Sequence, residues 1–409
     1  MVRFAKWLVS FVLPGGLLVL AAVGFLRPGG LPNVLLPLEQ VFASLVLAVG
    51  LLIGLYVRHS RVLLAMVLLA LADRALGSLA GVEASSAGID RAMFNAVGLL
   101  LPLNLLALAL ITEREIVISK EVLRLLLIFA QAFLVGWVSL PDNAPVAAAL
   151  ESPFVDPRYT RWTPLTQASL LAFGAALVLH TVRFTHYRNP VDRGFFWALV
   201  AVFLALHGMR AGWDPTNYLA TAGLILIVDT YAEVYRSTYY DELTGMGGRV
   251  ALDQALHHLG SQYAIALIDI DHMKQVNATH GYPAGDQVLR MVASKVSTSS
   301  AEGKAFRDDG NKFVAIFSGK PASEVARSLE ELRKAVATSP VTLRARRRWF
   351  RKPAAPEPVS VTISVGMAER DERRATSEQV IKAAEVALAR AKSSGGNQVK
   401  ARMAMKEQT

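Results

Sequence analysis

The sequence predicts two halves of different fold class: an N-terminal all-α polytopic membrane domain and a C-terminal α/β domain. The 409 residues are 53% hydrophobic, which is high for an ordinary soluble protein of this size. Long runs of Leu, Val and Ala recur before about Tyr231 with few charges. Beyond that point, apolar and charged residues alternate at helix and strand periods, as in a soluble domain.

The membrane domain is expected to occupy residues 1–232. A spanning helix needs roughly 20 apolar residues, and we identify about eight candidate segments. Pro14-Gly15-Gly16 interrupts the first segment and the seventh is short, so seven spans remains an open alternative. The segments are Trp7–Leu26, Val34–Val57, Val62–Val82, Ala92–Ile111, Val122–Leu140, Leu165–Val182, Gly194–Gly208 and Tyr218–Glu233.

Lys and Arg in the connections indicate the topology, because short cytoplasmic loops collect positive charge. With the N-terminus inside and eight spans, the inner segments hold about twice as many Lys and Arg as the outer loops. We therefore expect a multi-pass protein with lipid around its first half and with its C-terminal domain in the cytoplasm.

Four ionisable residues lie within these expected spans: Glu39, Asp73, Arg74 and Asp229. Charge inside a membrane is costly, which suggests a role in sensing a ligand or an ion. The alternative is that these residues lie near helix ends or pair between helices.

The join between the halves, residues 224–241, contains neither Gly nor Pro. The last span is therefore expected to continue into the cytoplasm as one connecting helix. Val228, Tyr231, Tyr235 and Thr238 follow the 3-4-3 spacing of a two-stranded seam. A continuous helix with such a seam would couple the membrane domain to the soluble domain and would favour a dimer.

The remainder, residues 240–409, is expected to form one α/β domain around a central sheet. Cysteine is absent, which excludes disulfides, thiolate metal sites and a Cys nucleophile. The expected helices are Arg249–Leu259, Asp286–Ser297, Ser323–Ala337 and Ser377–Ser393. The expected strands are Tyr263–Ile270, a hairpin over Ala305–Phe317, and Val359–Met367.

Two carboxylates, Asp269 and Asp271, close the first buried strand. A carboxylate at the C-terminal end of a buried strand is well placed to hold Mg²⁺ against a bound phosphate. The alternative is a strand that simply ends in Asp. Five polar or small residues that follow closely favour a site: Lys274, Asn277, Gly281, Gly285 and Asp286.

Five motifs in this half resemble the GGDEF family, the diguanylate cyclase domains. They cover essentially all of Tyr240–Lys400. In order they are DELTGMGGR (Asp241–Arg249), IDIDHMKQVNATHGYPAGDQVL (Ile268–Leu289), RDDGNKF (Arg307–Phe313), VTISVGMA (Val361–Ala368) and AAEVALARAKSSGGNQV (Ala383–Val399). The resemblance implies a central, mostly antiparallel sheet flanked by helices, in a protein of the bacterial inner membrane.

Active members of this family join two GTP molecules, one from each of two domains, into cyclic di-GMP and pyrophosphate. The resemblance implies a metal, Mg²⁺ or Mn²⁺, held by Asp269 and the carbonyl of Ile270 when nucleotide is bound. It further implies guanine contacts from Asn277 and Asp286, and phosphate contacts from Lys274 and Lys392.

The family's signature itself is altered here. Gly-Gly-Asp/Glu-Glu-Phe falls on Asp309, Gly310, Asn311, Lys312 and Phe313, so only the second Gly and the Phe are retained. The third position normally supplies the second metal carboxylate, which Asn311 replaces. The two lost acids make the hairpin more positive by about three charges, and one unit pair at 4 Å is worth about 4 kcal/mol at an effective dielectric near 20.

Two further departures point the same way. The family's phosphate-gripping Arg falls on Gly396, which has no side chain. The allosteric Arg-x-x-Asp motif would start at Ser300 and end at Gly303, where it is absent. We therefore expect no inhibitory product site.

The net charge of +10 includes a basic run, Arg344–Lys352. It could contact anionic lipid or a partner, or be a solvated hairpin insertion. No motif supports nucleic-acid binding.

Three functions compete. The first is an inner-membrane signalling protein with a catalytically inactive GGDEF domain that binds GTP, cyclic di-GMP or a protein, as a homodimer or with an active cyclase or effector. The second is a working diguanylate cyclase in which Asp308 or Asp309 shifts into the metal site. The third is a membrane receptor or transporter-like module with a GGDEF remnant.

Overall fold

The chain folds as two compact units, residues 1–234 and residues 235–409. The computed structural model describes residues 2–30, 36–77, 89–111, 118–138, 140–143, 145, 148, 151–299, 303–320, 322–342, 358–371 and 376–402. The basic run Arg344–Lys352, the segment 300–302 and the side chain of Glu39 lie outside this description.

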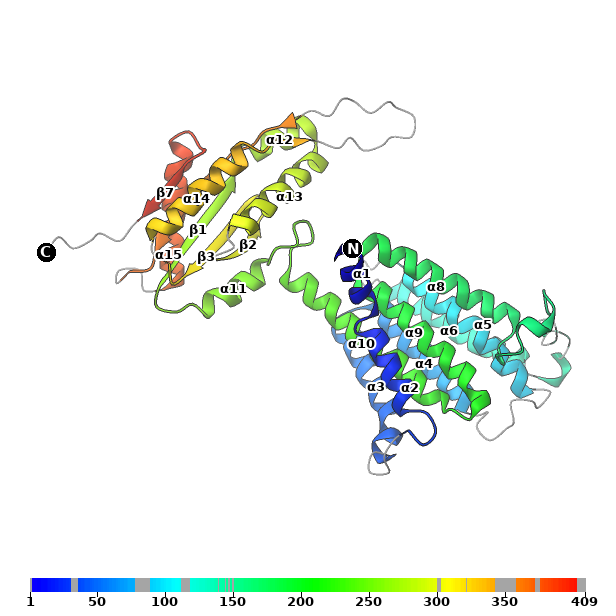
Figure 1. Ribbon diagram of the computed structural model, residues 1–409. Helices are drawn as coiled ribbons and strands as arrows, with labels where there is room; N and C mark the ends of the chain where they lie inside the picture. The colour runs from blue at the N-terminus through cyan, green and yellow to red at the C-terminus, as the bar shows by residue number, and fades with distance from the viewer. Residues whose placement is uncertain are drawn as a thin grey trace. The chain divides into compact units, whose positions relative to one another are not determined.

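The described part of the first unit is helical (Figure 1). Short 3₁₀ turns at Pro141–Asn143, Pro157–Tyr159 and Met209–Ala211 accompany longer helices. These are α1 (Val2–Val12), α2 (Gly15–Phe25), α3 (Leu36–Tyr56), α4 (Ser60–Gly77), α5 (Ile89–Leu110), α6 (Ile118–Val138), α8 (Gln167–Tyr187), α9 (Pro190–Gly208) and α10 (Pro215–Tyr239).

Three stretches of these helices are long and apolar enough to cross a membrane: Asp90–Leu110, Gln167–Tyr187 and Pro190–Ala211. Three shorter apolar helices accompany them: Gly15–Phe25, Val41–Tyr56 and Val122–Val138. By this measure the described residues do not reach the expected seven or eight spans. The first expected span, Trp7–Leu26, is divided between α1 and α2, because Pro14 cannot donate a helical hydrogen bond.

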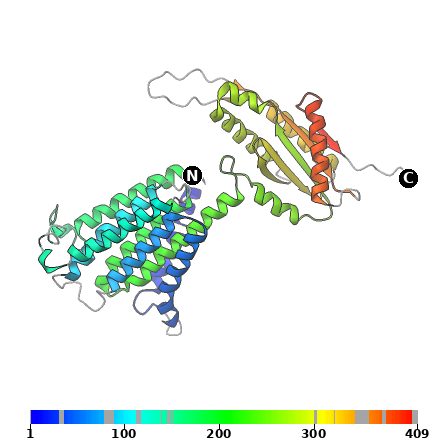
Figure 2. The ribbon, with the colours of Figure 1, turned by 180° about the vertical axis from the view of Figure 1, so that it is seen from behind.

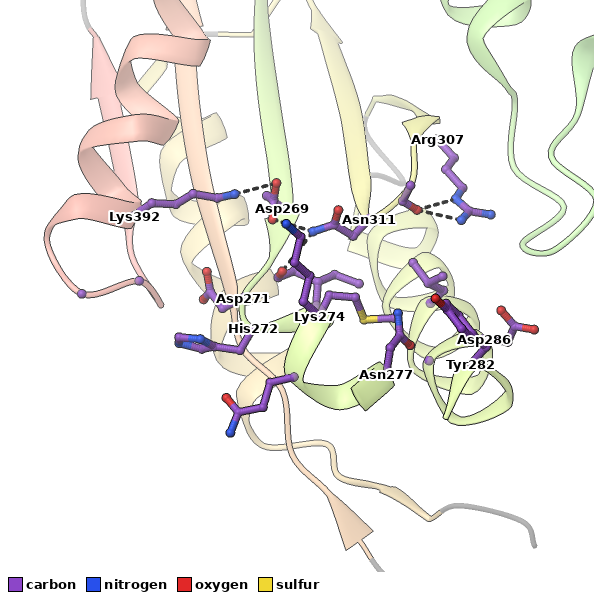
Figure 3. Close-up of a pocket in the computed structure, with 18 residues that line it drawn as sticks. Asp269, Asp271, His272, Lys274, Asn277, Tyr282, Asp286, Arg307, Asn311 and Lys392 are labelled. Carbon is purple, nitrogen blue, oxygen red and sulfur yellow. Dashed lines mark hydrogen bonds and ion pairs between the residues drawn. The ribbon is translucent and has the colours of Figure 1, made fainter. Parts of the chain in front are cut away.

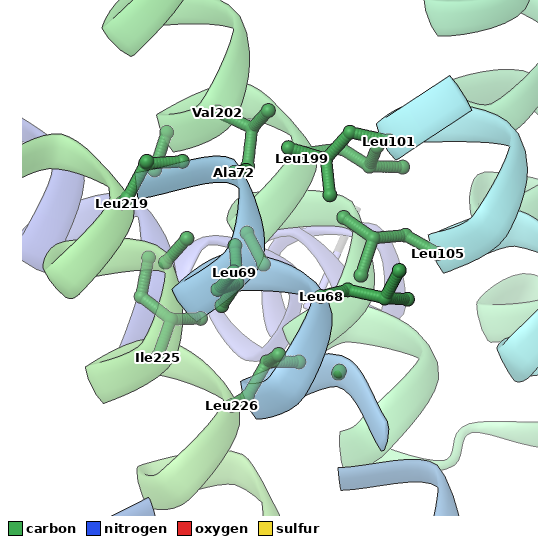
Figure 4. Close-up of a cluster of buried hydrophobic side chains, with 14 of the residues drawn as sticks. Leu68, Leu69, Ala72, Leu101, Leu105, Leu199, Val202, Leu219, Ile225 and Leu226 are labelled. Carbon is green, nitrogen blue, oxygen red and sulfur yellow. The ribbon is translucent and has the colours of Figure 1, made fainter. Parts of the chain in front are cut away.

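Buried aliphatic side chains from α4, α5, α9 and α10 form the core of this unit, as Figure 4 shows. Two acids are buried beside it in ion pairs between helices: Asp192 accepts from Arg183 at 2.8 Å, and Asp229 of α10 accepts from Arg193 of α9. Asp229 therefore pairs between helices, one of the two arrangements considered for charges within the spans.

The helix α10 continues without a break past Val234, the last residue of the first unit, to Tyr239. The expected connecting helix, residues 224–241, is thus helical over all but its last two residues. Tyr231, Tyr235 and Thr238 of the expected seam are exposed on its surface.

The second unit is an α/β domain with a five-stranded sheet in the order β2-β3-β1-β6-β7. In the described residues β6 and β7 pair parallel and the other neighbours pair antiparallel, so the sheet is mostly antiparallel, as expected. The strands are β1 (Tyr263–Ile270), β2 (Lys304–Asp309), β3 (Lys312–Ser318), β6 (Ile363–Glu369) and β7 (Val399–Arg402), with a separate pair β4 (Val341–Thr342) and β5 (Pro358–Val359).

Helices cover both faces of this sheet (Figures 1 and 2). Alternate residues of β1 point to opposite faces: Ile268 and Ile270 pack with α13 and α14, whereas Ile265 packs with α11 and α15. The helices are α11 (Arg249–His257), α12 (Met273–His280), α13 (Tyr282–Ser299), α14 (Ala322–Ala337) and α15 (Ser377–Ser393).

Two expected elements differ from the structure. The strand expected at Val359–Met367 is divided: Val359 belongs to β5, and β6 begins at Ile363. Residues 360–362 lie in neither strand, although the amide of Asp271 donates to the carbonyl of Thr362 just beyond the last pair of β1 and β6. The helix expected at Asp286–Ser297 begins earlier, at Tyr282.

Candidate functional site

A pocket of about 800 Å³ lies at the C-terminal end of β1, where the β2–β3 turn, α12, α13 and the end of α15 meet (Figure 3). Its lining divides into two groups of residues. We call Asp269, Ile270, Asn311 and Lys392 the strand half, and Lys274, Asn277, Gly285 and Asp286 the helix half.

Both carboxylate oxygens of Asp269 are occupied by groups from the protein. The amide of Asn311 donates from Nδ2 to Asp269 Oδ1 at 2.8 Å and to the carbonyl oxygen of Ile270 at 3.2 Å. The ammonium of Lys392 lies 2.7 Å from Asp269 Oδ2. Since both acceptors face the same Asn311 atom, that atom must be the NH₂ group. A donor thus occupies the point where Asp269 and the Ile270 carbonyl converge.

The β2–β3 turn brings Asn311 to this point. Gly310 has φ +50°, a conformation that glycine adopts without steric cost. Lys312 pairs with Asp269 in the strand register, which sets Asn311 beside the end of β1. Arg307 holds the turn by donating to the carbonyl of Gly310 at 2.7 and 3.1 Å.

Arg307 also ties the turn to the start of the domain. Its Nη1 donates to both oxygens of Asp241, at 2.8 and 2.9 Å. Burial alone would raise the pKa of Asp241, but hydrogen bonds from Thr244 and Arg307 outweigh it and lower that pKa below its usual value. Arg307 was not singled out in the sequence, where only its place ahead of the altered signature could have drawn attention to it.

The other acids of the turn face away from the pocket. Asp308 forms an ion pair with Arg249 of α11. Asp309 and Lys312 are exposed and are not among the lining residues. Phe313 is fully buried in the domain core. Among the signature positions, Gly310 and Asn311 therefore line the pocket, and the other three do not.

Lys392 reaches Asp269 because α15 packs very closely on the sheet. A side chain on Gly366 of β6 would overlap the backbone of Ala384 and Leu388 in α15, so only glycine fits there. This contact brings the last turn of α15 to the end of β1. The cation also lies at a helix C-terminus, where the helix dipole favours positive charge.

Asp271, the second carboxylate after β1, is buried and has its own partners. It accepts from Thr362 Oγ1 and Ser364 Oγ, both at 2.7 Å, and from the amide of Asn397 at 3.0 Å. Gly396 lies against it with φ +74°, and a Cβ there would be 3.2 Å from Asp271 Oδ2. Asp271 therefore fixes the turn between α15 and β7.

The helix half is different, because its polar groups have few partners. Asn277 Oδ1 is buried with no hydrogen-bond partner in the described residues. Asn277 lies directly against Gly285, where a Cβ would overlap its Oδ1 and come within 2.9 Å of Met273 Cε. Across the described part of the chain, neither Lys274 nor Asp286 forms a hydrogen bond or an ion pair that would occupy it.

The pocket thus brings together the residues that the family resemblance selected: Asp269, Ile270, Lys274, Asn277, Asp286, Asn311 and Lys392. Its donor set does not suit a divalent cation. Asp269 supplies the one carboxylate that meets Asn311, and that carboxylate already has an ammonium partner. Within the described residues, no three His, Cys, Asp or Glu side chains are grouped as metal ligands.

Comparison with known proteins identifies the second unit. Residues 238–398 match the family described as "Diguanylate cyclase, GGDEF domain". Diguanylate cyclase VdcA of Vibrio cholerae is 29% identical over 194 residues, covering 45% of this chain and 55% of that protein. Response regulator PleD of Caulobacter vibrioides is 32% identical over 167 residues, covering 39% of this chain and 35% of that protein. The chain thus spans about half or less of the length of these relatives.

Among solved structures, the coiled coil and GGDEF domain of DgcB from Caulobacter crescentus, in complex with c-di-GMP, is 32% identical. The match includes 45% of this chain and 95% of the DgcB chain, with a TM-score of 0.41. Together with the five motifs, the family match assigns the region: residues 238–398 of this chain are a GGDEF domain of the diguanylate cyclase family.

Proposed function

We propose that this chain is a membrane-anchored protein of cyclic di-GMP signalling whose GGDEF domain does not make cyclic di-GMP and acts by binding. One observation carries the proposal: the Asn311 amide donates to both Asp269 and the Ile270 carbonyl. These two acceptors and the side chain at position 311 are the groups that the family resemblance assigns to the metal. Here the third group is a donor directed at the other two.

Electrostatics oppose a divalent cation at this point. To ligate a metal, Asn311 would have to rotate its amide by half a turn, and Lys392 would have to release Asp269 or remain within a few ångströms of the cation. An amide oxygen carries no net charge, so one carboxylate would remain to balance a dication. Mg²⁺ is bound in proteins mainly through carboxylates and substrate phosphates, and the strand half offers too little negative charge.

A working cyclase in which Asp308 or Asp309 replaces the missing acid has less support. Asp308 has Arg249 as its partner on the far side of the turn, and Asp309 is exposed. Moving either carboxylate into the pocket would require the turn to be rebuilt and the contact of Arg307 with Gly310 to be broken.

The helix half supports nucleotide as the bound molecule. Guanine offers both hydrogen-bond donors and acceptors along its edge. The carboxylate of Asp286 and Asn277 Oδ1, both without a partner among the described residues, are acceptors for such donors. The ammonium of Lys274 is available for phosphate. We therefore propose a guanine nucleotide, GTP or cyclic di-GMP, held without a resident metal.

The first unit, in this proposal, anchors the domain at the bacterial inner membrane through seven or eight spans, with the GGDEF domain in the cytoplasm. Three apolar helices long enough to cross a membrane in the described residues support the anchoring, and the number of spans is part of the proposal. The exposed Tyr231, Tyr235 and Thr238 of α10 support dimerisation, with a second copy or with an active cyclase or effector. Domain limits of 1–232 and 240–409, joined by 224–241, remain part of this proposal.

The test uses the full-length protein in lipid nanodiscs. GTP is added with Mg²⁺ or Mn²⁺, and cyclic di-GMP is measured by mass spectrometry beside an active cyclase. We expect no product above the protein-free control. Calorimetry with GTP in the presence of EDTA is expected to give saturable heat. Product formed at the rate of the active cyclase would contradict the inactive assignment, and absence of heat with both GTP and cyclic di-GMP would leave only protein docking.

A further inference from the structure

A second cavity, of about 320 Å³, lies in the first unit among α4, α5 and α6. This volume is within the range of small-molecule sites. Each helix contributes one stripe of residues at helical spacing. The lining consists of Leu68, Leu71, Ala72, Arg74 and Ala75 of α4; Met93, Val97, Leu100, Leu101 and Asn104 of α5; and Ile128, Gln131, Ala132, Val135 and Gly136 of α6.

The walls are aliphatic, but one end carries an amide pair. Asn104 donates from Nδ2 to Gln131 Oε1 at 2.6 Å. Each amide keeps a further group for a ligand, because Asn104 Oδ1 can accept and Gln131 Nε2 can donate. Polar side chains on apolar helices are costly, so a pair that borders a cavity is a natural binding site for a hydroxyl group.

The other end carries positive charge. Of the described residues that line the cavity, Arg74 alone is charged. Its side chain is 85% exposed, and its nearest acid, Asp73, lies 4.0 Å away, at the limit of an ion pair. Leu68 and Leu101 both line the cavity, and Leu101 lies one helical turn before Asn104 on α5. Arg74 is six residues further along α4, which is about 9 Å of helix.

We propose that this cavity binds a medium-chain aliphatic carboxylate that carries a hydroxyl group at the far end of the chain. The carboxylate pairs with Arg74, the chain lies along the aliphatic walls, and the hydroxyl bonds the Asn104–Gln131 pair. Because α4 rises about 9 Å between Leu68 and Arg74, we take a ten-carbon chain as the probe. This inference concerns the first unit and does not depend on the nucleotide chemistry proposed above.

The cavity has a route to the connecting helix. On α4, Leu68 and Ala72 face the cavity, while Met66 and Leu69 pack on α10 at Gly223. A Cβ at Gly223 would lie 3.4 Å from Met66 Sδ, so α4 and α10 approach each other there. A ligand that displaces α4 therefore changes the packing of α10, the helix that continues into the second unit.

Binding can be measured with the full-length protein in phosphatidylcholine nanodiscs, titrated with 10-hydroxydecanoate, decanoate and neutral 1,10-decanediol. We expect saturable binding of the hydroxy acid, with decanoate and the diol each roughly tenfold weaker, because each lacks one polar contact. Arg74→Gln is expected to weaken binding of the hydroxy acid roughly tenfold and to leave the affinity for the diol unchanged.

A cavity-filling variant locates the site. Gly136 lines the cavity and a Cβ there meets nothing within 4 Å, so Gly136→Leu adds bulk at the cavity wall without a clash and is expected to abolish binding. Gly174→Leu, equally free of contacts but on α8, is the matched control, and Arg158→Gln controls for loss of positive charge. Wild-type affinity in Gly136→Leu, or equal binding of the acid and the diol with no effect of Arg74→Gln, overturns the proposal.

Discussion

The strand half and the helix half of the nucleotide-sized pocket differ in how their polar groups are satisfied. In the strand half, Asp269, Asn311 and Lys392 bind one another. In the helix half, Asn277 Oδ1 is buried without a partner in the described residues, and Asp286 is open. In the proposed function, the groups assigned to the metal are engaged with one another, while the groups assigned to guanine stay open to a ligand.

The largest expected effect comes from restoring acids to the strand half. Asn311→Glu with Lys312→Glu removes the donor, adds two carboxylates and removes one positive charge, so the net charge beside Asp269 falls by three. GTP binding should become at least tenfold tighter with Mn²⁺ than with EDTA, whereas wild-type binding is expected not to depend on the metal. Calorimetry on the full-length protein in nanodiscs gives both constants.

The matched control is Lys304→Glu with Lys400→Gln, which makes the same charge change on exposed strand positions outside the pocket. If this control gains the same dependence on Mn²⁺, the effect is one of overall charge. The contrast between the two halves would then lose its basis in local geometry.

The helix half is tested next with Gly285→Ala. The new Cβ would overlap Asn277 Oδ1, so the amide must move away from its present position. We expect guanine nucleotide binding to weaken roughly tenfold, the usual cost of one well-placed polar contact. Gly260→Ala, where a Cβ meets nothing within 4 Å, should bind as the wild type does. Unchanged affinity in Gly285→Ala would remove Asn277 from the site.

A smaller effect is expected from Lys392→Gln. The variant leaves the buried Asp269 carboxylate with the Asn311 amide as its partner. The effect is modest because the Lys392 side chain is about half exposed, so solvent already screens the ion pair. The free energy of local opening at β1 should fall by about 1–2 kcal/mol. Hydrogen exchange of the β1 amides in the full-length protein measures it. Exchange as slow as in the wild type would mean that the strand half is not held by this pair.

The smallest effect concerns pH. The pKa of Asp241 is lowered in the folded state, where Thr244 and Arg307 outweigh the effect of burial. Its contribution is therefore present above the unfolded pKa, near 3.9, and is lost as the pH falls through the lower, folded value. Arg307→Gln should reduce local stability of the β2–β3 turn by about 1 kcal/mol at pH 7. The free energies of local opening that hydrogen exchange of the turn amides gives for wild type and variant should begin to converge below about pH 4. A constant difference down to pH 3 would assign the loss to packing.

Elements with a clear period were predictable from the sequence. The bounds of β1 and α15 agree with the sequence prediction, because YAIALIDI is continuously apolar and α15 repeats Ala at helical spacing. In the second unit, the short strand β4 was missed, and so were two longer elements. The helix α12, MKQVNATH, is short and mostly polar, and β7, VKAR, is largely exposed, so neither carries a hydrophobic period.

The candidate site divides in the same way. Motif positions selected most of the lining residues, since chain order and spacing identify them. The contacts could not be predicted, because they depend on how distant segments approach. The ion pair of Lys392 with Asp269 was not predicted and arises because α15 packs against β6 at Gly366, while the phosphate contact of Lys392 stays a prediction. Likewise Arg307 meets Asp241 across 66 positions of sequence.

The ammonium of Lys392 beside Asp269 gives the domain a counter-ion of its own. An enzyme that borrows Mg²⁺ for this position responds to the free concentration of that metal. Lys392 is part of the chain, so the pocket would not need a metal from solution. Its occupancy should therefore depend on the nucleotide concentration. It should also fall as the ionic strength rises, because salt screens the charges of Lys274 and Lys392. Bound nucleotide would then leave as the molecule that arrived, and the lifetime of the complex would be set by dissociation alone.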